Sequence, residues 1–190
     1  MDATATTIVV RVFVLGIDPG LSRCGYGAVR TRAAGIGGRA APQAEAVAVG
    51  VIRTSPADPL PQRLAELQGE LRAIISELRP DVVAVERVFF QVNVRTAMSV
   101  GQASGLAMAE AVACGCAVAQ YSPNEVKLAV AGDGGADKAA VAAMVQRLLG
   151  LAAPPTPADA ADAAALALCH LAHAPVQARL AAAGSRARLR

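Results

Sequence analysis

The chain of 190 residues is long enough to bury one good hydrophobic core, and its length favours a single domain. Charged residues make up only 17% of it, yet no stretch has the length and apolar character of a membrane-spanning helix, and the start does not resemble a signal peptide. A net charge of +3 does not by itself indicate a nucleic-acid-binding protein, and the cysteines lack zinc or disulfide spacing. We therefore expect a cytoplasmic protein with no membrane contact, folded over residues 8–175, with flexible tails at 1–7 and 176–190.

The N-terminal part is predicted to form three antiparallel strands. An apolar, β-branched run from Ile8 to Ile17 is typical of a strand covered on both faces. It ends at an Asp-Pro-Gly turn. Cys24 to Thr31 and Ala46 to Arg53 have the composition of further strands, joined by a Gly- and Ala-rich connection at 33–43. Successive strands with short links indicate an antiparallel meander.

A change of hydrophobic period marks the first helix. Leucine and isoleucine recur at three- and four-residue steps from Leu60 to Leu78, which predicts an amphipathic helix that ends before Pro80. Val82 to Glu86 is then predicted to be a fourth strand, parallel to an earlier one because a helix leads into it. Like the first strand, it ends in a carboxylate.

The next segment is predicted to be a long helix, from Val94 to Gly115, followed by a short fifth strand from Ala117 to Tyr121. Gly101, Gly105 and Ala109 recur every four residues on this helix. They would leave a smooth ridge that another backbone can approach, either that of the sheet or that of a second subunit.

Three more helices are expected toward the C-terminus. Ser122-Pro123-Asn124-Glu125 combines an N-cap, a proline at the first helical position and a capping-box glutamate, and so predicts the start of a helix that carries Lys127. Asp137 can cap the next helix, which ends at Gly150. The last helix is predicted from Ala158 to about His173.

Four acidic residues suggest a function. Asp18 and Glu86 end strands at what should be the same edge of the sheet, and Asp159 and Asp162 lie three residues apart on one helix face. Each has an ordinary alternative, since an Asp-Pro-Gly turn can simply end a strand and acids favour helix N-termini. If the helix packs across the strand ends, the carboxylates meet and require cations. Mg²⁺ or Mn²⁺ takes such ligands, and two ions about 3.5–4 Å apart suit phosphoryl displacement.

Several motifs resemble those of the RuvC family of bacterial Holliday-junction resolvases. Leu15-Gly16-Ile17-Asp18-Pro19-Gly20 with Gly25-Tyr26-Gly27 is similar to the first motif of the family, and Glu86-Arg87-Val88-Phe89-Phe90 with Asn93 to the second. Two further runs resemble its long helix and its last acidic helix: Val100-Gly101-Gln102-Ala103-Ser104-Gly105 and Ala158-Asp159-Ala160-Ala161-Asp162-Ala163. The resemblance covers residues 12–175 in order.

The resemblance implies an α/β, ribonuclease-H-like fold with a five-stranded mixed sheet flanked by helices. It implies metal-dependent endonuclease activity on four-way DNA junctions, in recombination and repair. The catalytic, metal-binding residues would be Asp18, Glu86, Asp159 and Asp162, with two Mg²⁺ ions per subunit, or Mn²⁺ in their place. It also implies a homodimer that works beside a branch-migration motor, RuvA and RuvB.

The same resemblance assigns DNA contacts. Lys138 would reach the reacting phosphate, and Lys127, Phe89 and Phe90 would contact the junction. An exposed base stacked on an aromatic side chain contributes about 1–3 kcal/mol. Without the resemblance, Lys138 would be interpreted as a solvated lysine, and one of the two phenylalanines as a core residue.

Two other functions fit parts of the pattern. An actin- or Hsp70-like phosphotransferase also has a first strand that ends in an aspartate near a glycine turn, but it needs a second such unit, for which the chain is too short. A junction-binding scaffold without catalysis is the other candidate. It has no need to gather four acids beside phosphates.

Overall fold

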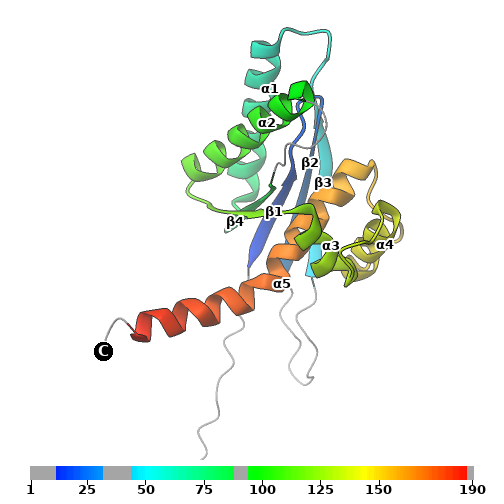
Figure 1. Cartoon of the computed structure of the whole chain (residues 1–190). Coiled ribbons are helices and arrows are strands. Elements are labelled where there is room, and N and C mark those ends of the chain that lie inside the picture. The colour runs from blue at the N-terminus through cyan, green and yellow to red at the C-terminus, as the bar shows by residue number, and fades with distance from the viewer. Residues whose placement is uncertain (1–11, 32–43, 88–93, 188–190) are drawn as a thin grey trace, which may run out of the picture.

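The computed structural model describes residues 12–31, 44–87 and 94–187, with the backbone alone described for residues 94–96 and 175–187. The strands of the described residues are β1 (Phe13–Asp18), β2 (Arg23–Thr31), β3 (Ala44–Arg53), β4 (Val82–Glu86) and β5 (Ala117–Tyr121). They form one sheet in the order β3-β2-β1-β4-β5 (Figure 1). The first three strands pair antiparallel, whereas β4 and β5 run parallel to β1. The predicted meander and the parallel fourth strand are both confirmed.

Helices flank the sheet on both faces (Figure 1). They are α1 (Leu60–Leu78), α2 (Val94–Ala113), α3 (Pro123–Ala131), α4 (Lys138–Leu149) and α5 (Ala158–Ala187). α1 and α2 cover one face, and α3, α4 and α5 cover the other, where α5 packs across β1 and β2. This is the predicted fold class. None of these helices, as far as the structure describes them, has the length and apolar character needed to pass through a bilayer.

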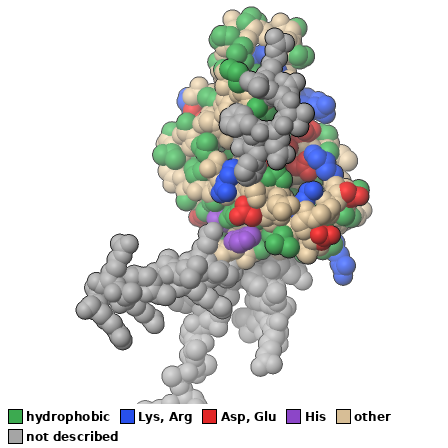
Figure 2. Space-filling view, viewed as in Figure 1, with side chains coloured by type: hydrophobic (Ala, Val, Ile, Leu, Met, Phe, Trp, Pro, Cys, Tyr) green, Lys and Arg blue, Asp and Glu red, His purple; other side chains and the backbone are tan. Residues whose placement is uncertain are grey.

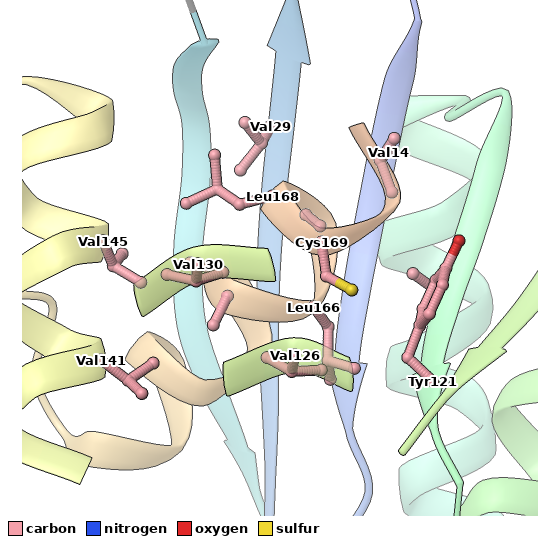
Figure 3. Close-up of a cluster of buried hydrophobic side chains, with 14 of the residues drawn as sticks. Val14, Val29, Tyr121, Val126, Val130, Val141, Val145, Leu166, Leu168 and Cys169 are labelled. Carbon is pink, nitrogen blue, oxygen red and sulfur yellow. The ribbon is translucent and has the colours of Figure 1, made fainter. Parts of the chain in front are cut away.

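Two hydrophobic cores, one on each face of the sheet, follow from the alternation of side chains along the strands. On β1, Val14 packs into the core beneath α3, α4 and α5, whereas Leu15 and Ile17 point into the core beneath α1 and α2. Figure 3 shows the first core, where Val14 and Val29 of the sheet meet valines of α3 and α4 and buried residues of α5. Protein interiors are close-packed, so the two cores hold the strands, and with them the strand ends, in fixed positions.

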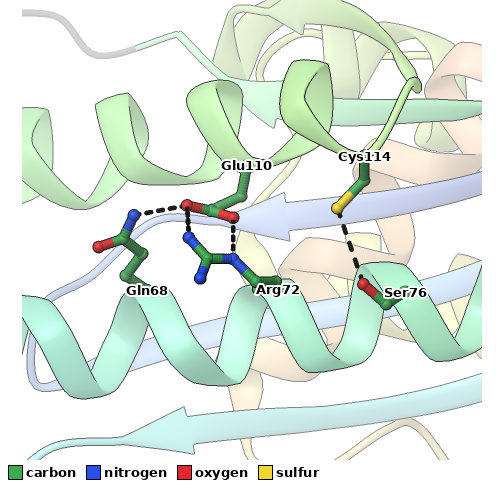
Figure 4. A network of polar contacts seen from close by, with 5 residues as sticks. All are labelled: Gln68, Arg72, Ser76, Glu110 and Cys114. Atoms are coloured by element: carbon green, nitrogen blue, oxygen red, sulfur yellow. Dashed lines mark hydrogen bonds and ion pairs between the residues drawn. The ribbon is translucent and has the colours of Figure 1, made fainter.

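An ion pair between exposed Arg72 on α1 and buried Glu110 on α2 joins the two helices (Figure 4). Glu110 on α2 is only 3% exposed, and its carboxylate accepts hydrogen bonds from Arg72 Nε at 2.8 Å and Arg72 Nη2 at 2.9 Å. Gln68 donates a third hydrogen bond to it. These bonds, those of Arg72 first, hold the pKa of Glu110 below its usual value. A buried carboxylate without such partners would destabilise the fold, so this contact holds the two helices in one relative position.

Local capping signals locate the start of α3 and both ends of α4 as predicted. The hydroxyl of Ser122 accepts a hydrogen bond from the backbone N–H of Glu125. The carboxylate of Glu125 in turn accepts one from the backbone N–H of Ser122, which completes the capping box. Asp137 Oδ1 accepts from the Ala140 N–H at 2.8 Å and begins α4. Gly150 ends α4 with a φ of 64°, in the left-handed region that favours glycine.

The last helix is longer than predicted. α5 continues to Ala187 instead of ending at about His173, so residues 176–187 are helical where a flexible tail was expected. Pro175 lacks the N–H of one backbone hydrogen bond. The alanine-rich sequence that follows it has a high helix propensity, and the helix goes on.

Some predictions fall on parts of the chain that the structure does not describe. The expected start of the first strand at Ile8, the tail at 1–7 and the whole connection at 33–43 lie outside the described residues, as do Phe89 and Phe90. The boundaries of the single domain, residues 8–175, therefore stay a prediction.

Candidate active site

The parallel register of β1 and β4 brings the first two acids together. Ile17 pairs with Val85, so the residue after each, Asp18 and Glu86, stands at the same edge of the sheet on adjacent strands. Side chains alternate along a strand, and residues two apart share a face. Val14 and Ala84 belong to the core beneath α5. Asp18 and Glu86 therefore point toward α5.

Three glycines let α5 lie directly on the strands. A Cβ on Gly27 would stand 2.6 Å from Cα of Ala164, and one on Gly16 or Gly25 would overlap a carbonyl oxygen of α5. The oxygen beside Gly25 is that of Asp159, and Gly25 pairs with Asp18 across the β1–β2 ladder. The first turn of α5 thus lies beside Asp18. Gly25 and Gly27 lie two residues apart on one face of β2. This spacing is the sequence signal that could have predicted the close contact between α5 and the sheet.

Burial and neighbouring carboxylates raise the pKa values of Asp18 and Glu86. Burial, with the charges of Glu86, Asp162 and Asp159, raises the pKa of Asp18 to about 7, and Lys138 opposes the rise. The pKa of Glu86 is raised by burial and by Asp162. The structure therefore gathers all four predicted acids into one electrostatic cluster, at the edge of the sheet where β1 and β4 end.

Two cations stand at this cluster. Lys138 Nζ donates to Asp162 Oδ2 at 2.7 Å, and this bond raises the lysine pKa. Lys138 is the first residue of α4, so the capping of that helix by Asp137 sets its position. Arg23, at the start of β2, has its Nη1 3.7 Å from Asp159 Oδ2. The sequence predicted Lys138 at the site but not Arg23.

Lys127, the other predicted lysine, lies on α3 and is half-buried. No hydrogen bond or ion pair among the described residues links it to the four acids. In the face seen in Figure 2, basic and acidic side chains are interspersed. This agrees with the modest net charge of the chain.

A second contact fixes α5 beside Glu86. Tyr121, which pairs with Glu86 across the β4–β5 ladder, shares a 2.8 Å hydrogen bond with Nδ1 of the buried His170 on α5. The rings of the two residues meet edge to face. The turns of α5 that follow Asp162 are therefore held to β5 as well as to the glycines of β1 and β2.

The chemistry of this donor set fits a hard divalent cation. Carboxylate oxygens are the preferred ligands of Mg²⁺ and Mn²⁺, and the raised pKa of Asp18 reflects negative charge gathered in a partly buried place. Within the described part of the chain, no three His, Cys, Asp or Glu side chains stand together ready to hold an ion. Two of the four acids are paired with Lys138 and Arg23 instead.

Comparison with known proteins decides the family. The model of the family described as crossover junction endodeoxyribonuclease RuvC matches residues 14–170. The chain belongs to the RuvC family. A relative from Salinispora arenicola, itself named crossover junction endodeoxyribonuclease RuvC, is 54% identical over 175 residues, which cover 92% of this chain and 96% of the relative.

Solved structures of the family have the same fold. The Thermus thermophilus RuvC structure matches with a TM-score of 0.78 and 37% identity, covering 87% of this chain and 96% of that one. T. thermophilus RuvC in complex with Holliday junction substrate matches with a TM-score of 0.79 and 36% identity, with the same coverage. The RuvC resemblance and the ribonuclease-H-like fold predicted from the sequence are thus confirmed.

Proposed function

We propose that this RuvC-family chain is a structure-selective endonuclease that resolves four-way DNA junctions in recombination and repair. It would hydrolyse one phosphodiester in each of two symmetry-related strands. The proposal rests on the placement of Asp18 and Glu86 at the ends of adjacent strands beside the first turn of α5, where the charges of Asp159 and Asp162 act on Asp18. A solved relative in complex with Holliday junction substrate supports the choice of DNA.

In this proposal the four acids hold two Mg²⁺ ions per subunit, or Mn²⁺ in their place. When bound, such ions activate a water and stabilise charge on a phosphate. Asp18 and Glu86 supply ligands from the sheet, where burial keeps bulk water away from them. Asp159 and Asp162, now paired with Arg23 and Lys138, would supply ligands from α5.

The basic and aromatic residues complete the proposal. The ammonium group of Lys138, once it leaves Asp162, would face an oxygen of the reacting phosphate from the start of α4. Lys127 would contact the junction backbone from α3. Phe89 and Phe90, which follow β4 in the sequence, would contact an exposed base. The chain would act in the cytoplasm.

A homodimer belongs to the same proposal. A four-way junction has approximate two-fold symmetry, so a dimer with C₂ symmetry would present one site to each of two strands. The motor proteins RuvA and RuvB are the further partners that the family resemblance implies.

A synthetic four-way junction with Mg²⁺ tests the proposal. We expect paired, symmetric nicks from the wild-type protein. Asp18→Asn should bind the junction but cut it about 100-fold more slowly or worse. Mutation of a residue that only hydrogen-bonds a metal ligand lowers activity by up to about 100-fold, and loss of the ligand itself should lower it at least as much. Binding by gel shift and cutting on a denaturing gel would be measured on the same samples.

Asp58→Asn is the matched control, since it makes the same chemical change in the exposed turn before α1, far along the chain from the four acids. It should cut at the wild-type rate. Normal cutting by Asp18→Asn would contradict the assignment of Asp18. Wild-type protein that binds the junction and leaves it intact in Mg²⁺ and in Mn²⁺ would favour the scaffold function instead.

A further inference from the structure

Arg23 is a cation at the carboxylate cluster to which the proposed function gives no role. Its guanidinium stands 3.7 Å from Asp159 Oδ2, a separation longer than a close hydrogen bond. The arginine side chain is 58% exposed, against 29% for Asp159. It therefore faces the acid from the solvent side, with N–H groups open to a ligand.

The backbone that carries Arg23 is held in place from two other elements. The Thr54 hydroxyl, buried at the end of β3, donates to the carbonyl of Leu21, and the Thr54 N–H donates to the carbonyl of Ser22 at 3.4 Å. From α1, Arg63 donates to the Ser22 hydroxyl at 2.6 Å and to the Thr54 hydroxyl at 3.0 Å. The turn between β1 and β2 is thus set before any ligand arrives, and with it the position of Arg23.

Arg23 and Lys138 flank the cluster from different elements. Lys138 at the start of α4 pairs with Asp162, and Arg23 at the start of β2 pairs with Asp159. The two acids are neighbours on one face of α5. A DNA backbone that enters a site with four carboxylates meets like charge, which flanking cations offset. A guanidinium is well suited to this, because its planar set of donors matches two phosphate oxygens at once.

We propose that Arg23 binds a backbone phosphate of the DNA substrate beside the phosphate that is cut, from the start of β2, whereas Lys138 reaches the site from the start of α4. In the free protein Arg23 stands beside Asp159 as its ion-pair partner. If Asp159 bound a metal ion instead, the guanidinium would be available to the DNA. The inference rests on the proposed function, since it names a substrate contact of the same site.

Junction binding, measured without cutting, tests this contact. Fluorescence anisotropy of a labelled four-way junction would be followed in Mg²⁺ for the Asp18→Asn protein with and without Arg23→Gln, over a series of salt concentrations. We expect Arg23→Gln to weaken binding about 5- to 10-fold at moderate salt and to reduce the slope of log K against log[salt] by about one, the value for one lost phosphate contact. Arg23→Lys should bind with intermediate affinity, because it keeps the charge but not the fork of donors.

Arg30→Gln is the matched control. Arg30 lies on the same strand and is also exposed, in a surface pair with Glu45 at 3.3 Å. It should leave both affinity and salt slope unchanged. The inference would be overturned if adding Arg23→Gln to the Asp18→Asn protein changed neither the affinity for the junction nor the salt slope, whatever its effect on thermal stability. Failure of the proposed function would show separately, as wild-type protein that does not cut the junction.

Discussion

At the scale of the residue, the placement of Asp18 among buried and charged groups lowers the stability of the metal-free protein. Burial and three neighbouring acids raise the pKa of Asp18 from 3.8 to about 7. Groups placed for function often oppose folding in this way. The cost belongs to the ionised form, so it depends on pH.

We expect Asp18→Asn to stabilise the metal-free protein at pH 8 and to do so much less at pH 5. The folded pKa lies above the unfolded one, so the folded state binds the proton more tightly. This contribution to stability is fully present below pH 3.8 and is lost as the pH rises through about 7. Asparagine does not titrate. The difference between variant and wild type should therefore grow by about 2–3 kcal/mol between pH 5 and pH 8.

Urea unfolding in EDTA at the two pH values would measure this difference. Added Mg²⁺ is the control, because an ion bound to ionised Asp18 should stabilise the wild type more than the variant. An equal effect of Asp18→Asn at both pH values would mean that burial and the neighbouring acids do not raise the pKa of Asp18.

At the scale of the element, the site depends on how closely α5 approaches the sheet. Gly16 on β1 and Gly25 and Gly27 on β2 present bare backbone to it. Glycine in a strand lowers stability on conformational grounds, so the three positions are explained by the helix that they admit. With side chains there, α5 would stand further out and carry Asp159 and Asp162 away from Asp18.

Gly27→Ala should therefore destabilise the protein and slow junction cutting together. The added methyl group would meet Ala164 at 2.6 Å, and overpacking of this kind costs about 1–3 kcal/mol. Thermal unfolding and the cutting assay would be compared on the same preparation.

Gly69→Ala on α1 provides the control of opposite sign. Nothing lies within 4 Å of a Cβ at Gly69, and alanine in a helix interior is favoured over glycine by about 0.5–1 kcal/mol. This variant should be slightly more stable than wild type and cut normally. A Gly27→Ala protein as stable as wild type would show that α5 does not rest on β2 there.

At the scale of the whole molecule, α2 has an uncovered face. Its buried stripe consists of Ala103, Ala107 and Ala111, which pack against the sheet and α1. The predicted ridge of Gly101, Gly105 and Ala109 lies on the opposite side of the helix and is exposed, so the alternative that the ridge meets the sheet was wrong. Two large apolar side chains extend the same face: Met98, 60% exposed, and Val112, 66% exposed.

We expect this face to form the contact between two copies of the chain. A bulky charge at its centre, as in Gly105→Arg, should turn a dimer into a monomer in sedimentation velocity, because close helix approach requires a small residue there. Leu148→Glu, at an exposed apolar position on α4, is the control and should stay dimeric. A Gly105→Arg protein that remains a dimer would place the subunit contact elsewhere.

The sequence by itself determined the order and type of the elements. The signals for these act within a few residues: the hydrophobic period of α1, the capping box at Ser122 and Glu125, and the cap at Asp137. It also showed that two strands end in acids and that one helix begins with two more. Together with the family resemblance, this was enough to predict the sheet, its flanking helices and the four candidate ligands.

Only the tertiary structure decided which charges meet and how closely. That Lys138 pairs with Asp162 and Arg23 with Asp159 depends on the relative positions of β2, α4 and α5, which are far apart along the chain. That the ridge of α2 faces solvent depends on which stripe the core buries. Local patterns specify elements, but the contacts of a site arise from packing between them.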